Sequence, residues 1–230
     1  MDEIIFKSVA TAWGTCGLIW KTKADRDATL LRVLAAENEA AKVELVARAL
    51  FPTAKRVKNS GGAGEPAWIW MVSDFLRDYY DSKRPPVDQF QIGLLDQILD
   101  WSECGEFQRQ VLQATAKIAF GQRVSYGQLA RRIGRPGAAR AVGSALAKNP
   151  WPVIVPCHRV IGADGGMRGF SAPGAVAAKA RMICMEEQRS GRGTNAMEPS
   201  SSARRQSGLF EQPAFVQAGF VIGQAASGLD

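Results

Sequence analysis

The chain has 230 residues, 46% of them hydrophobic, so it can bury a core as one compact domain or as two small ones. It has no apolar stretch of the roughly 18 residues that a membrane helix needs, and its start, MDEIIFKSVA, lacks the basic front of a signal peptide. We therefore expect a soluble cytoplasmic protein, associated with the nucleoid if it is bacterial, rather than a membrane-spanning or secreted one.

The net charge of +7 is unevenly distributed along the chain. Residues 1–104 carry 13 basic and 15 acidic side chains (net −2), whereas residues 105–189 carry 13 and 4 (net +9). A basic segment of this size is typical of a nucleic-acid-binding unit, because phosphate contacts supply much of the affinity. A basic face that is merely solvated is the alternative interpretation.

The four cysteines are scattered singly, and His158 is the only histidine. Without a Cys-x-x-Cys pair or a second histidine, we expect no zinc site and no other metal. Thiols in the cytosol stay reduced, so we also expect no disulfides.

The first hundred residues have the mixed pattern of an α/β unit. The runs IIFKSVATA and CGLIWKT predict two strands around a turn at Trp13 and Gly14, and the apolar spacing of residues 39–50 predicts a helix. After the loop at residues 59–66, a second helix is expected in AWIWMVSDFLRDYY. Its stripe of large side chains is interpreted as core: Trp68, Met71, Phe75 and Tyr79.

Residues 88–104 are ambiguous between helix and strand, and we place a domain boundary there. The run FQRQVLQATAKIA then predicts a helix that buries one face and ends at Phe120 and Gly121. That face is formed by Phe107, Val111, Ala114 and Ile118.

Two short helices are expected next. Ser125 is the predicted N-cap of the first, SYGQLARRI, and after the turn GRPG the second runs through PGAARAVGSALAK. Two short helices around a tight turn make a candidate helix-turn-helix. The second helix is rich in alanine and carries one long charged side chain near its start, Arg140, so it could lie close to a DNA groove with that arginine in the base stack. Tight packing against another helix would also explain the alanines.

Cys157 and His158 are adjacent in the motif PCHRV, after VIV, which reads as a short buried strand. A thiol is mostly protonated at neutral pH, and a neighbouring base can convert it to the more nucleophilic thiolate. A carboxylate usually orients such a base. The acids available between residues 105 and 189 are Glu106, Asp164, Glu186 and Glu187. A structural Cys-His pair is the alternative.

This part of the chain resembles the catalytic domain of the O6-alkylguanine-DNA alkyltransferases, also called methylated-DNA-protein-cysteine methyltransferases. PCHRV is highly specific to that family, and RAVG and the NP turn at Asn149 strengthen the match. The similarity is close over residues 105–187 and looser before them, where TAWGTCGLIW resembles the family's first hairpin.

The resemblance implies irreversible, single-turnover transfer of an alkyl group from O6 of guanine, and also from O4 of thymine, in double-stranded DNA to Cys157. His158 would be the water-assisted base and Glu186 the carboxylate that orients it. No cofactor is implied, and we expect a monomer. The residues that would bind the substrate or DNA are Tyr126, Arg140, Asn149, Val160, Phe170 and Ser171. Phe170 and the SAPG run after it depart from the family's usual tyrosine and Gly-Gly pair.

The expected fold class is therefore α+β. A small N-terminal α/β domain with an antiparallel sheet (residues 1–104) precedes a mostly helical domain with the helix-turn-helix and the cysteine (residues 105–189), and a disordered tail follows (residues 190–230). Two other functions stay open. One is a lesion-binding module of the alkyltransferase-like kind, which would not transfer the alkyl group, and the other is a helix-turn-helix regulator.

Overall fold

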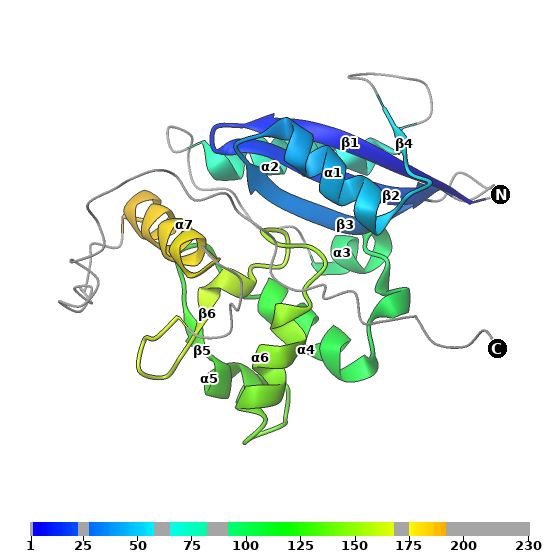
Figure 1. Cartoon of the computed structure of the whole chain (residues 1–230). Coiled ribbons are helices and arrows are strands. Elements are labelled where there is room, and N and C mark those ends of the chain that lie inside the picture. The colour runs from blue at the N-terminus through cyan, green and yellow to red at the C-terminus, as the bar shows by residue number, and fades with distance from the viewer. Residues whose placement is uncertain (1, 23–27, 58–64, 82–91, 168–174, 192–230) are drawn as a thin grey trace, which may run out of the picture.

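In a computed structural model, the residues that can be described are 2–22, 28–57, 65–81, 92–167 and 175–191. They form a mixed helix and sheet fold, which confirms that coarse part of the expected class (Figure 1). The Phe170–Gly174 loop and almost all of the tail lie outside the described residues.

A four-stranded sheet dominates the N-terminal half, with the order β3-β2-β1-β4. Its strands are β1 (Glu3–Thr11), β2 (Gly14–Thr22), β3 (Ala28–Glu37) and β4 (Lys55–Arg56). The predicted hairpin is confirmed, since β1 pairs antiparallel with β2 from Glu3–Thr22 to Thr11–Gly14. Only glycine fits at Gly14, because a Cβ there would lie 2.2 Å from the carbonyl oxygen of Glu37. The expected antiparallel pairing holds for β1, β2 and β3, but β4 is parallel to β1, because helix α1 carries the chain back across the sheet before β4 begins.

The two faces of this sheet are covered by different helices (Figure 1). Because side chains alternate along a strand, Ile19 packs with α1 (Ala40–Leu50), whereas its neighbours Leu18 and Trp20 point to the opposite face. That second face packs with α2 (Ala67–Tyr80) and with the C-terminal half. Both helices were predicted from their spacing.

The buried face of α2 differs from the predicted one. Ile69, Val72, Leu76 and Tyr79 are fully buried, whereas Met71 is 37% exposed. Trp68 and Phe75 are only partly buried. Trp68 and Phe75 still pack against the core, so of the predicted stripe only Met71 is exposed. Apolar residues lie nearly all round this helix, so the aromatic stripe did not mark the centre of its buried face.

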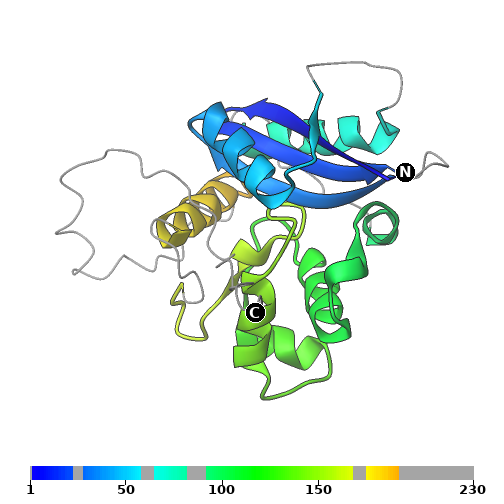
Figure 2. The same cartoon turned by 45° about the vertical axis from the view of Figure 1, so that its right-hand side comes forward.

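The C-terminal half is mostly helical and lies against the sheet, as the turned view in Figure 2 also shows. It contains α3 (Ile92–Ile98), α4 (Glu106–Ala116), α5 (Tyr126–Arg132), α6 (Ala139–Ala147) and α7 (Ala175–Arg189), with short 3-10 helices at Trp101–Glu103 and Cys157–Arg159 and a parallel pair, β5 (Val124–Ser125) and β6 (Val160–Ile161). Helix α4 ends at Ala116, before the predicted end near Phe120. Its buried residues are Val111, Leu112, Thr115 and Ala116, so Ile118 is buried beyond the helix and not on its face.

The start of α5 is the one predicted. The Ser125 hydroxyl accepts a hydrogen bond from the Gln128 backbone N–H at 3.1 Å, and the Gln128 side chain accepts one from the Ser125 N–H at 2.6 Å. This capping box satisfies two groups that a helix start otherwise leaves unpaired. A six-residue connection separates α5 from α6.

The run VIV is buried, as expected, but it is not a strand. Val153 has φ of 73°, a left-handed conformation that breaks the run, and only an isolated bridge joins Pro152 to Val155. A turn at this point aims the following residues back into the protein.

One hydrophobic cluster contains residues from both sides of the expected boundary near residue 104, from Val9 and Trp20 to Val155 and Met185. The Trp151 indole N–H also donates to the carbonyl of Leu30 in β3 at 2.9 Å. Of the helices that the structure describes, none is long and apolar enough to cross a membrane.

Candidate active site

A single 3-10 turn, Cys157–Arg159, brings together the cysteine, the histidine and an arginine. The turn is fixed by Asn149, whose amide donates to the Val155 carbonyl at 2.8 Å and accepts from the Trp151 N–H at 3.0 Å. Cys157 is half-buried, whereas His158 is only 2% exposed. Residue Cys157 is thus partly exposed, while the imidazole beside it is enclosed.

Glu186, on α7, is the carboxylate that meets His158. Its Oε1 lies 2.8 Å from His158 Nε2, and both side chains are buried. Of the four acids that the sequence offered, Glu186 is thus brought to the imidazole, as the resemblance implied. Because α7 follows the cysteine by some twenty residues, only the tertiary fold could bring the two together.

Arg159 balances the charge of this buried carboxylate. Its Nε donates to Glu186 Oε2 at 2.9 Å and its Nη2 donates to Oε1 at 2.9 Å, while Nη1 donates to the Ile118 carbonyl at 2.6 Å. The backbone N–H of Gly121 adds a bond to Oε2 at 3.0 Å. A buried charge is tolerated when it is paired and hydrogen-bonded in this way.

The protonation states follow from this environment. Burial acts to raise the pKa of Glu186, but hydrogen bonds and charge from His158 and Arg159 prevail and lower it to about 2. Burial lowers the pKa of His158, although Glu186 acts in the opposite direction. At neutral pH the pair is therefore an ionised carboxylate and a neutral imidazole.

An ionised carboxylate can only accept hydrogen bonds. The short contact with Glu186 therefore places the ring proton of His158 on Nε2, and Nδ1 keeps the lone pair. A neutral imidazole with a fixed free nitrogen is the form that acts as a base.

Cys157 is a thiol that needs such a base. Burial raises its pKa, and the opposing influences are a hydrogen bond from Asn149, the positive charge of Lys179 and backbone N–H groups. Lys179 is 1% exposed, and its Nζ donates to the carbonyl of Val160 at 2.6 Å. Burial lowers the pKa of Lys179 to about 8, so it is still largely charged at neutral pH.

Tyr126 and Val160 also lie beside this cluster. The Tyr126 hydroxyl is 3.5 Å from Lys179 Nζ, and burial together with the nearby Cys157 raises the pKa of Tyr126 to about 12. Val160 is buried in β6. A Cβ built at Gly143 would lie 3.7 Å from the Tyr126 ring, so α6 passes directly beside this tyrosine.

Arg140 is not part of the buried cluster. It is exposed near the start of α6, where Arg131, Arg132 and Arg135 are exposed on the neighbouring α5 and turn. The remaining two expected residues, Phe170 and Ser171, lie outside the described residues.

Sequence reasoning missed three residues of this cluster. Arg159 stood inside the PCHRV motif without a role, and Lys179 was given none. Tyr79 was assigned to the core, yet its hydroxyl donates to Glu186 Oε1 at 2.9 Å and lies 3.0 Å from His158 Nε2. A phenol buried on an otherwise apolar face was the signal that could have indicated a polar partner.

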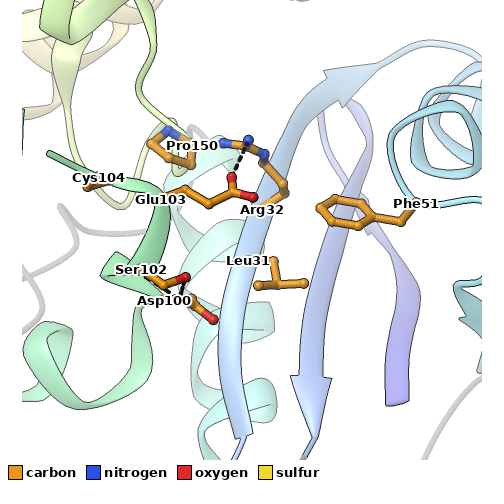
Figure 3. Close-up of a pocket in the computed structure, with 8 residues that line it drawn as sticks. All are labelled: Leu31, Arg32, Phe51, Asp100, Ser102, Glu103, Cys104 and Pro150. Carbon is orange, nitrogen blue, oxygen red and sulfur yellow. Dashed lines mark hydrogen bonds and ion pairs between the residues drawn. The ribbon is translucent and has the colours of Figure 1, made fainter. Parts of the chain in front are cut away.

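A pocket elsewhere contains none of these residues (Figure 3). It lies between β3 and the Trp101–Glu103 turn, where Arg32 pairs with Glu103 at 3.3 Å. This pocket is therefore separate from the candidate active site. Within the described ranges, no group of three or more histidine, cysteine or acidic side chains could hold a metal ion.

Comparisons with known proteins show which family the C-terminal part of the chain resembles. Residues 106–188 match the model of the family described as 6-O-methylguanine DNA methyltransferase, DNA binding domain. A methylated-DNA–protein-cysteine methyltransferase of Salmonella typhimurium is 43% identical over 100 residues, which are 44% of this chain and 54% of that protein. One of Mycolicibacterium paratuberculosis is 47% identical over 85 residues, 37% of this chain and 50% of that protein. The chain thus spans about half the length of the curated relatives it matches.

The fold is similar over a longer range. The crystal structure of the Mycobacterium tuberculosis O6-methylguanine methyltransferase superposes with a TM-score of 0.55 at 26% identity, over 89% of this chain and 99% of that one. The same organism's protein in complex with DNA gives a TM-score of 0.54 at 26% identity, over 80% and 93%.

Proposed function

Because residues 106–188 belong to the 6-O-methylguanine DNA methyltransferase family, we propose that this protein repairs DNA by transferring an alkyl group from O6 of guanine to the sulfur of Cys157. The observation that carries the proposal is the partly exposed Cys157 beside a neutral imidazole, whose Nε2 lies 2.8 Å from buried Glu186. The DNA complex of the Mycobacterium tuberculosis protein supports DNA as the partner.

In the proposed reaction, His158 Nδ1 takes the thiol proton through a bridging water. The thiolate attacks the alkyl carbon, an S–C bond forms, and the C–O6 bond breaks with its electron pair going to the guanine. The guanine gains one proton, which balances the proton lost by the thiol. The thioether is stable, so each molecule reacts once, and transfer from O4 of thymine would follow the same steps.

The base must leave the duplex to reach the sulfur. Extrusion costs a few kcal/mol, and less for a damaged base that pairs poorly. Tyr126, beside Cys157 and α6, is suited to contact the extruded nucleotide, and Asn149 to fix the turn between α6 and the cysteine. Val160 would offer its backbone to the base, and Phe170 and Ser171 would complete the pocket.

Helices α5 and α6 would act as the helix-turn-helix that contacts DNA. Arg140 is exposed at the start of α6, where its side chain could fill the gap that the extruded base leaves. The exposed arginines of α5 and the turn would bind phosphates, which accounts for the net charge of residues 105–189. The division at residue 104 into an N-terminal and a DNA-binding unit belongs to this proposal.

The test is mass spectrometry after incubation with a duplex that contains O6-methylguanine. We expect one added methyl group on the peptide that contains Cys157, at one methyl per protein molecule. Cys157→Ala should abolish transfer. Cys184→Ser is the matched control, because Cys184 is an exposed free thiol and should leave transfer unchanged.

Other outcomes would contradict the proposal. Continued turnover beyond one methyl per molecule would exclude a single-use acceptor. Tight, lesion-dependent binding with an unmodified Cys157 would indicate a lesion-binding module. Binding to intact DNA of defined sequence, with no response to the lesion, would indicate a regulator.

A further inference from the structure

We propose that Tyr79, contributed by α2 in the N-terminal half of the chain, is a positioning residue that holds His158 in its Nε2–H form and completes the hydrogen-bond shell of Glu186. This inference rests on the proposed function, but part of its test does not depend on transfer activity. Tyr79 contacts neither Cys157 nor the substrate in this scheme, so it acts through the imidazole.

The hydroxyl of Tyr79 touches both members of the pair. It lies 2.9 Å from Glu186 Oε1 and 3.0 Å from His158 Nε2, and all three residues are at most 2% exposed. A buried hydroxyl without a partner would cost free energy, and this one has two. The three groups form a closed triangle, since Nε2 and Oε1 are themselves 2.8 Å apart.

The direction of these bonds follows from the charges. Burial, and next the charge of Glu186, raise the pKa of Tyr79 well above its ordinary value, so the phenol keeps its proton. Its O–H donates to the carboxylate, which can only accept, and its oxygen lone pairs then face Nε2. Nε2 therefore has two acceptors next to it, and only a protonated Nε2 satisfies both. With the proton on Nδ1 instead, the Nε2 lone pair would face at least one oxygen lone pair at close range.

Other contacts keep the phenol in this position. Its ring packs edge-on against the rings of Tyr80 and Phe120. The distances between ring centroids are 5.1 Å and 6.3 Å. At the other end of the residue, Arg189 of α7 donates to the Tyr79 backbone carbonyl at 2.6 Å. Helix α7, which carries Glu186, is thus joined to the end of α2 through the side chain and the backbone of one residue. The N-terminal half would in this way take part in the chemistry and not only in folding.

The test compares Tyr79→Phe with Tyr80→Phe. Each change removes one buried hydroxyl from the same helix end, but only Tyr79 contacts His158 and Glu186. The rate of Cys157 modification by the free base O6-benzylguanine is measured from about pH 5 to pH 9, the range in which a histidine titrates. We expect Tyr79→Phe to react roughly tenfold more slowly at neutral pH, as for loss of a hydrogen bond to a charged group, and Tyr80→Phe to match the unaltered protein.

The pH profile separates positioning from mere stability. The groups that act on His158 are Glu186 and Lys179 from α7, Arg159 from its own turn, and Tyr79 from α2. Without the hydroxyl, the carboxylate is less compensated and favours imidazolium. The acid limb of the rate profile should therefore move to higher pH in Tyr79→Phe, which a loss of folded protein alone would not cause.

His158 is the only histidine, so its ring nitrogens can be assigned in untagged protein by 15N NMR without ambiguity. We expect the proton on Nε2 in the unaltered protein and titration of the ring at higher pH in Tyr79→Phe. A proton on Nδ1 in the unaltered protein would overturn the inference even if the variant failed to fold. Identical titrations in both proteins would overturn it as well. Absence of transfer in the unaltered protein would refute the proposed function, and the NMR result would still decide the role of Tyr79.

Discussion

Replacing Glu186 by glutamine should destabilise the protein strongly, because Arg159 would stay buried without a carboxylate partner. The pKa of Glu186 falls from 4.5 to about 2 on folding, and at about 1.4 kcal/mol per pKa unit this is a contribution of about 3 kcal/mol. Breaking a buried ion pair by removing one partner typically costs about 3–5 kcal/mol, and the contribution worked out for Glu186 lies at the lower end of that range.

The loss should depend on pH in one direction. A carboxyl whose pKa is lowered by folding stabilises the native state fully above its unfolded pKa, and this stabilisation disappears as the pH falls through the folded value. The difference in unfolding free energy between the unaltered protein and Glu186→Gln should thus be largest at neutral pH and shrink between pH 4.5 and about 2.

Urea unfolding followed by tryptophan fluorescence, at neutral pH and at steps below pH 4.5, measures this difference. The control is Glu187→Gln, because Glu187 is the next residue but forms its ion pair near the surface. Its Oε1 lies 2.6 Å from Arg123 Nη2, and the side chains of Glu187 and Arg123 are 21% and 39% exposed. That pair should contribute at most about 1 kcal/mol. An equal loss for both variants, or a loss for Glu186→Gln that does not change with pH, would refute the account of the buried pair.

Three further changes test other parts of the structure. Arg140→Ala should slow repair of duplex DNA much more than reaction with free O6-benzylguanine, since only the duplex leaves a gap to fill; equal losses on both would remove Arg140 from that role. Lys179→Met should raise the pKa of Cys157, because a positive charge is removed. The pH dependence of iodoacetamide labelling measures this pKa, and an unchanged profile would show that Lys179 is purely structural. Ser125→Ala should cost about 1 kcal/mol in urea unfolding through loss of the N-cap, and an unchanged midpoint would show that the capping box does not stabilise α5.

Local signals in the sequence were sufficient for much of the fold. The β1–β2 hairpin, helices α1 and α2 and the Ser125 cap each depend on residues close together in the chain, so periodicity and capping rules could find them. The phase of α2 could not be found in this way, because apolar residues lie nearly all round it and only the sheet decides which are buried. The turn at Val153 also escaped prediction, because a valine in the left-handed region is rare.

Sequence reasoning likewise found some residues of the candidate site and missed others. Cys157 and His158 are neighbours in a distinctive motif, and the resemblance pointed to Glu186. Tyr79 reaches the pair from 79 residues before His158 and 107 before Glu186, and no rule of spacing connects them. It lay in a helix whose aromatic residues all looked alike in sequence. The hydroxyl of Tyr79 meets His158 and Glu186 only because the fold places the end of α2 next to α7.

In the proposed reaction, the arginine of PCHRV would allow a buried histidine to serve as a base. A carboxylate alone beside an imidazole in a buried site would draw a proton onto the ring, and an imidazolium cannot accept the thiol proton. Arg159 supplies the positive charge in advance, so Glu186 is compensated before His158 is protonated, and burial then keeps the ring neutral. Glu186 can therefore orient the imidazole through Nε2 without converting it to the acid form. In the proposed reaction, this pairing would also limit the proton affinity of His158. Once the imidazole had taken the thiol proton, the nearby charges of Arg159 and Lys179 would favour its transfer to the departing guanine.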